Sequence, residues 1–165
     1  MYIIQRLNKE HNCKAFDCGQ NKINDFLKQQ ANQSIKKHYS QTHVLIDDNA
    51  PQQIIGFYTL NSVLIDKPLQ HQINIKYPYD LFGVNLARMG SDINFQKNSL
   101  SSHLIIDALE KTLIINNNMG CQGLFLDAKN SELIKYYKKF GFELLLEIEN
   151  KMWLPIGTIN ALADC

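Results

Sequence analysis

The stretch Asn130–Phe142, NSELIKYYKKFGF, decides the fold. Asn130 is a residue type that caps helix N-termini, and Leu133 and Tyr137 follow at a spacing that places them on one helix face. Gly141 ends the segment, because glycine readily adopts the left-handed backbone of a helix C-terminus. The pattern predicts a short helix with a tyrosine on its apolar face, followed by a turn into an apolar strand.

The composition favours one ordinary globular domain. The chain has 165 residues, of which 45% are hydrophobic and 20% charged, and its formal net charge is +1. This length suits a single domain, and the charge balance alone implies no particular partner. We therefore expect one domain spanning residues 1–165.

The cysteines and the apolar runs indicate where in the cell the protein is expected. Cys13, Cys18, Cys121 and Cys165 are scattered and form no C-x-x-C pair, so neither a disulfide framework nor a metal site is expected. The chain opens on residues typical of a strand rather than a leader peptide, and no apolar run approaches membrane-spanning length. The expected location is the cytoplasm, without a metal or a membrane partner.

Hydrophobic periodicity predicts the other elements. Apolar residues recur at helical spacing from Ile23 to Ile35, and again from Ser101 until residues 116–120 end the helix. Alternating or β-branched runs predict strands at 2–7, 42–46, 54–65, 84–93, 123–128, 142–148 and 151–154. Residues 66–82 lack periodicity and are expected to form an irregular excursion.

This order of elements predicts a mixed α/β or α+β layer fold. The strand, loop and helix over 84–113 form the expected ligand-binding unit. Gly56 marks a place where a second backbone can approach closely, because it has no side chain.

Several motifs resemble the GNAT acetyltransferase superfamily. They are Ala87–Asp92, Gln96–Ser101 and Tyr136–Phe142, in the family's order. Phe16-Asp17-Cys18-Gly19 and the following Ile23–Leu27 resemble one branch, the TacT-type toxins of bacterial toxin-antitoxin modules. The resemblance covers roughly residues 14–154. It implies the GNAT fold, a mixed and mostly antiparallel central sheet flanked by helices.

The resemblance also implies a site for acetyl-CoA. The family's loop reads Gln or Arg, two residues, Gly, one residue, then Gly or Ala, and its backbone N–H groups wrap a pyrophosphate. Here Gln96 is present, and both glycine positions are serine, Ser99 and Ser101. The alternative is a plain strand-to-helix turn that these serines cap. By resemblance, the cofactor-binding residues are Met89, Gly90, Ser91, Gln96, Lys97, Asn98, Ser99, Leu100, Ser101, Ser102 and Asn130.

The aligned catalytic residue is Tyr137, three residues before Phe140. In the family this hydroxyl acts as general acid for the departing thiolate, while the amine attacks directly. Tyr136 points about 100° away around the helix, so both tyrosines cannot do this. The alternative is that Tyr137 is only a buried aromatic residue.

The resemblance implies that the amine belongs to aminoacyl-tRNA, so that acetylation halts translation. It also implies a ribbon-helix-helix antitoxin as partner and allows a homodimer. Two alternatives stay open: a GNAT enzyme for a small-molecule or peptide amine, and a binding module that no longer catalyses. Basic residues that could contact RNA phosphates, or simply lie on solvated helix faces, are Lys28, Lys36, Lys37, Arg88, Lys135, Lys138 and Lys139.

Overall fold

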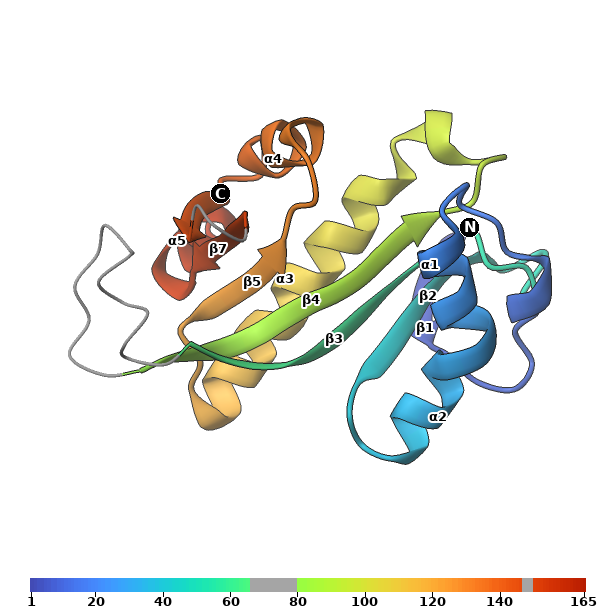
Figure 1. Ribbon diagram of the computed structural model, residues 1–165, viewed down its shortest axis with the longest axis horizontal. Coiled ribbons are helices and arrows are strands. Elements are labelled where there is room, and N and C mark those ends of the chain that lie inside the picture. The colour runs from blue at the N-terminus through green and yellow to red at the C-terminus, as the bar shows by residue number, and fades with distance from the viewer. Residues whose placement is uncertain (66–79, 147–149) are drawn as a thin grey trace. The chain divides into compact units, whose positions relative to one another are not determined.

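The computed structural model describes residues 1–65, 80–146 and 150–165 (Figure 1). Its main elements are β1 (Tyr2–Arg6), α1 (Asn21–Asp25), α2 (Ala31–Lys36), β2 (Gln41–Asp47), β3 (Gly56–Ile65), β4 (Leu81–Ser91), α3 (Leu100–Met119), β5 (Gly123–Asp127), α4 (Ser131–Lys138), β6 (Glu143–Leu146), β7 (Lys151–Pro155) and α5 (Ile156–Ala163). Short 3-10 turns cover Cys13–Ala15 and Gln96–Asn98. The expected excursion over 66–82 lies outside the described residues, except for 80–82.

The strands form one sheet in the order β1-β2-β3-β4-β5-β7-β6. Pairing is antiparallel for β1 with β2, β2 with β3, β5 with β7 and β6 with β7. By contrast, β4 and β5 run parallel, with Val84 opposite Leu124. The mixed, mostly antiparallel α/β fold expected from the sequence is therefore confirmed.

The residues group into two compact units. One combines Met1–Asn61 with Ala87–Ala108, and the other combines Ser62–Leu86 with Leu109–Cys165. Three elements, β3, β4 and α3, continue from one unit into the other along the chain (Figure 1). The single domain expected from the sequence stays a prediction.

The first unit has an aromatic core. Phe57 on β3 is fully buried, and the ring of Phe16 meets it edge-on at 5.3 Å between centroids. Phe26 stacks on the same ring at 6.5 Å. The helix expected from Ile23 is present, but it contains a π turn over Phe26–Gln30, where the Ala31 N–H donates to the Phe26 carbonyl.

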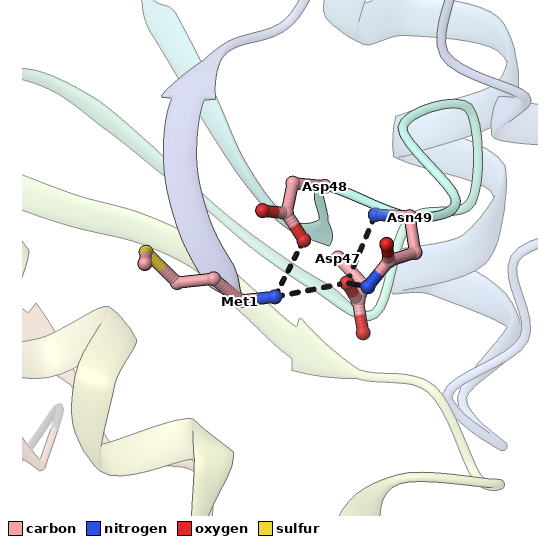
Figure 2. Close-up of polar contacts among 4 residues, drawn as sticks. All are labelled: Met1, Asp47, Asp48 and Asn49. Carbon is pink, nitrogen blue, oxygen red and sulfur yellow. Dashed lines mark hydrogen bonds and ion pairs between the residues drawn. The ribbon is translucent and has the colours of Figure 1, made fainter.

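The edge of the first unit is held by the N-terminal amine (Figure 2). The ammonium of Met1 lies 2.5 Å from Asp48 Oδ1 and 3.2 Å from Asp47 Oδ1. The same Asp47 oxygen accepts from the backbone and side-chain nitrogens of Asn49. The Asn49 N–H, with the ammonium next, lowers the pKa of Asp47 to about 2. These contacts tie the start of β1 to the end of β2.

In the second unit, glycines allow neighbouring strands to approach closely. A Cβ at Gly83 would lie 2.4 Å from the Gly123 carbonyl oxygen, and one at Gly123 would lie 2.4 Å from the Leu154 oxygen. Next to them, the rings of Phe125 and Trp153 pack at 5.5 Å between centroids. The core of this unit therefore depends on glycines at both positions.

Some expected boundaries were wrong. The strand placed at 84–93 covers Leu81–Ser91. It starts earlier because Phe82 exchanges hydrogen bonds with Gln122. It ends earlier because the Ile93 N–H donates to the Asp17 carbonyl, outside the sheet. Helix α5 was not expected at all.

In the parts of the chain that the structure describes, no helix combines the length and apolarity needed to cross a membrane.

Candidate functional site

The segment after β4 folds into a tight turn around a buried carboxylate. Asp92 Oδ1 accepts from the backbone nitrogen of Asn94 at 3.0 Å and from its side-chain nitrogen at 2.9 Å. The Phe95 N–H donates to the Asp92 carbonyl at 2.9 Å. The chain then makes a 3-10 turn over Gln96–Asn98 and enters α3. The loop expected from the sequence is thus a defined turn.

Ser99 keeps a backbone that favours glycine. Its φ is 54° and its ψ is 15°, in the left-handed region. Non-glycine residues reach this region at a modest cost. Serine at this position therefore still adopts the backbone conformation that a glycine would supply.

The first turn of α3 follows directly. The Ser102 hydroxyl donates to the Ser99 carbonyl at 2.6 Å, and the Ser102 N–H points to the same oxygen at 3.2 Å. The first N–H groups of a helix lack helical partners and carry partial positive charge, so they favour an anion. This end of α3 has the chemistry of a phosphate-binding site.

Gln96 uses its side chain inside the protein. Its Nε2 donates to the Ser91 carbonyl at 2.9 Å and to the Cys18 carbonyl at 3.1 Å. Because both bonds use Nε2, any direct contact of Gln96 with a cofactor would use atoms of Gln96 other than Nε2. The predicted cofactor residues from Met89 to Ser102 all belong to the first unit.

Asn130, the remaining predicted cofactor residue, belongs to the second unit and caps α4. Its Oδ1 accepts from the Leu133 N–H at 2.9 Å. The cap is confirmed, and the contact with a cofactor stays a prediction.

Tyr137 is buried in the second unit, with 8% of its surface exposed. Its ring packs edge-on against Phe142 at 5.7 Å and against Tyr136 at 5.4 Å. Burial raises the pKa of Tyr137 to about 12. No other residue in the described ranges hydrogen-bonds its hydroxyl. The result is a neutral phenol that can donate a hydrogen bond to a ligand.

The turn after α4 sets this ring in place. Gly141 has a φ of 96°, as expected for the end of this helix. The Phe142 N–H then donates to the Tyr137 carbonyl at 3.3 Å. Tyr136 is only half-buried and packs against Phe140 at 5.3 Å. The two tyrosines therefore occupy different environments, as their spacing on the helix predicts.

The predicted RNA contacts are divided between the units. Lys28, Lys36 and Lys37 are exposed in the first unit, where the Arg88 guanidinium lies 5.0 Å above the centre of the Phe26 ring. In the second unit, exposed side chains on and after α4 are Lys135, Lys138 and Lys139. Their contact with RNA stays a prediction.

Sequence reasoning missed a partly buried polar pair in the first unit. The Tyr58 hydroxyl donates to Asp107 Oδ2, and the imidazole of His43 stacks on the Tyr58 ring at 5.0 Å. Tyr58 and Asp107 are 49 positions apart. No local spacing signals such a pair, so only the fold reveals it.

Comparison with known proteins gives a consistent picture, although no family model matches the chain. The probable toxin TacT of Sinorhizobium fredii is 27% identical, over 97% of this chain and 94% of its own. A tRNA-acetylating toxin of Mycobacterium tuberculosis is 24% identical over 85% of this chain and 83% of its own.

Solved structures show the same fold. AtaT complexed with acetyl-methionyl-tRNAfMet superposes with a TM-score of 0.88 and 24% identity, covering 99% of both chains. A tyrosine-to-phenylalanine mutant of the AtaT toxin superposes with a TM-score of 0.86 and 25% identity, covering 98% of this chain and 93% of that one.

Proposed function

We propose that this chain, which has the GNAT fold and resembles the TacT-type toxins along nearly its whole length, transfers an acetyl group from acetyl-CoA to the α-amine of aminoacyl-tRNA. The observation that carries the chemistry is Tyr137, a buried residue whose neutral hydroxyl no described residue bonds. The acceptor is supported by the relatives, one named as a tRNA-acetylating toxin and one solved with acetyl-methionyl-tRNAfMet.

The residues divide the work as follows. Backbone N–H groups at Ser99 and Leu100 hold the pyrophosphate at the start of α3. Acetyl-CoA supplies a thioester, whose C–S bond breaks as the amine forms a C–N bond to the acetyl carbon. Tyr137 donates a hydrogen bond from its hydroxyl to the departing sulfur, which leaves as a thiolate, and the proton lost by the amine passes to water.

Burial of Tyr137 has a chemical consequence. A phenol with a pKa of about 12 is a weaker acid than an ordinary thiol, whose pKa is about 8.5. Tyr137 therefore stabilises the developing thiolate mainly by donating a strong hydrogen bond to it. This role needs the neutral form, which is the form present at physiological pH.

The proposal includes a protein partner and a location. AtaT has been solved with the C-terminus of the antitoxin AtaR and acetyl-CoA, and we extend this kind of pairing to the present chain. An enzyme that acts on charged tRNA works in the cytoplasm. Expression should arrest growth, and an antitoxin encoded beside it should restore growth.

The acceptor is tested by incubating the protein with acetyl-CoA and a mixed pool of charged tRNA. Mass spectrometry of the released aminoacyl groups then shows which of them carry acetyl. We expect acetylation of one or a few aminoacyl species and none on free amino acids. Acetylation of small amines with no product on tRNA would support the small-molecule enzyme instead, and no binding of acetyl-CoA would support a non-catalytic module.

A further inference from the structure

The turn from Asp17 to Asn24 belongs to the motif that resembles the TacT branch. The proposed mechanism assigns no role to this turn. The turn is tightly built. Asp17 Oδ1 accepts from the Gly19 N–H and from Asn24 Nδ2, both at 2.8 Å. Asn24 Oδ1 accepts from the Cys18 N–H at 2.9 Å, and Asn24 is only 7% exposed. The Gly19 N–H, followed by Asn24, holds the pKa of Asp17 below its ordinary value.

The same turn is bonded to the loop that follows β4. The Asp17 N–H donates to Asp92 Oδ2 at 3.1 Å, and the Ile93 N–H donates to the Asp17 carbonyl at 2.8 Å. The Cys18 carbonyl accepts from Gln96 Nε2 at 3.1 Å. Three hydrogen bonds thus connect the turn to successive points of one loop.

Packing reinforces these bonds. A Cβ added at Gly90 would lie 3.0 Å from the Ile23 side chain and 3.4 Å from the Cys18 side chain. The turn therefore rests directly on the end of β4, from which the loop departs. Every one of these residues lies in the first unit.

We infer that Asp17 and Asn24 are positioning residues for the cofactor loop. They shape the turn that presents the Cys18 carbonyl to Gln96 and the Asp17 N–H to Asp92, and these two contacts fix where the loop enters α3. Because Ser99 must adopt a left-handed backbone without being glycine, the loop needs this outside support. The inference rests on the proposed binding of acetyl-CoA at the loop.

The test compares Asn24→Ala with Thr42→Val. Thr42 is fully buried in the same unit, and its hydroxyl bonds that of Thr59 at 2.8 Å, so it controls for general loss of stability. We expect Asn24→Ala to weaken acetyl-CoA binding roughly three- to tenfold in calorimetry. Its KM for acetyl-CoA should rise by a similar factor while kcat at saturation stays near wild type. Thr42→Val should leave both KM and Kd unchanged.

A second variant covers the case in which Asn24→Ala does not fold. Asp17→Ala alters an exposed side chain of the same turn and should raise the Kd for acetyl-CoA in the same way. Combined with Gln96→Met, it should weaken binding less than the product of the two single effects, because both act through the Cys18 carbonyl.

The outcomes are distinguishable. A wild-type protein that binds acetyl-CoA, with Asp17→Ala and Asn24→Ala binding equally well, overturns the inference and leaves the proposed function intact. An equal loss of binding in Thr42→Val also overturns it. A wild-type protein that does not bind acetyl-CoA overturns the proposed function itself, and the inference with it.

Discussion

Position 99 holds a serine in the left-handed backbone that glycine would favour. This conformation costs an L-residue about 1–2 kcal/mol, which a glycine avoids. Glycine in turn loses more conformational freedom on folding, about 0.5–1 kcal/mol. The balance lies close to zero or slightly in favour of glycine, so serine at this position costs little stability.

A matched pair of variants tests this reading. Ser99→Gly should leave the free energy of unfolding unchanged or raise it by up to about 1 kcal/mol, because strain is relieved. Ser101 lies in the first turn of α3, and Ser101→Gly should lower the free energy of unfolding by about 0.5 kcal/mol, because glycine weakens a helix more than serine does. Urea denaturation measures both. An equal loss in the two variants would contradict the left-handed backbone at Ser99.

Tyr137 makes a pH prediction. Its pKa is raised to about 12 in the folded protein, against about 10 in the unfolded chain. Between these values the unfolded chain loses the proton and the folded one keeps it, so stability falls as the pH rises. The titration of Tyr137 should lower the free energy of unfolding by about 2 kcal/mol across this pH range. We would measure the free energy of unfolding of wild type and of Tyr137→Phe from pH 9 to 12. Their difference isolates the titration of Tyr137, because the other tyrosines titrate in both proteins. A flat difference would show that the hydroxyl is not buried.

Among the elements, α4 is the one that the sequence predicts best. Its cap at Asn130, its buried Tyr137 and its glycine turn all follow from local spacing, and all are present. The close approach expected at Gly56 is also confirmed, since a Cβ there would lie 3.2 Å from the Gly90 carbonyl oxygen. Such features depend on neighbours in sequence or on one missing side chain, which a sequence displays directly.

Other elements could not be foreseen. The early start of β4 depends on a contact between distant residues, Gln122 with Phe82. The same holds for the site: Gln96 was expected to serve a cofactor, and the two carbonyls that its amide binds include Cys18, 78 positions away. Long-range partners of this kind carry no local periodicity.

Two variants of Asn130 distinguish its role as the cap of α4 from its predicted contact with the cofactor. Asn130→Ala should lower the free energy of unfolding by about 1 kcal/mol, because the Leu133 N–H loses its acceptor. Asn130→Asp should restore that stability, since a carboxylate caps and also suits the helix dipole. The second role, contact with the cofactor, is tested by the KM for acetyl-CoA. We expect this KM to rise in Asn130→Asp. An unchanged KM would show that Asn130 only caps the helix.

At the scale of the whole molecule, similarity to the TacT-type toxins extends over nearly the entire chain. The net charge of +1 gives no general attraction to RNA, so the affinity for tRNA that we propose would come from local lysines and arginine. Fold and cofactor class follow from the combined pattern of motifs. The preferred aminoacyl group does not, because neither the motifs nor the described elements identify an acceptor pocket.

The central claim is that Tyr137 assists acetyl transfer to aminoacyl-tRNA. The most direct measurement is the single-turnover rate of acetylation of charged tRNA by wild type and Tyr137→Phe at saturating acetyl-CoA. We expect the variant to bind acetyl-CoA like wild type and to react roughly 10²–10³-fold more slowly, the range for loss of a hydrogen-bond donor to a developing anion. An equal rate in the two proteins would contradict the account.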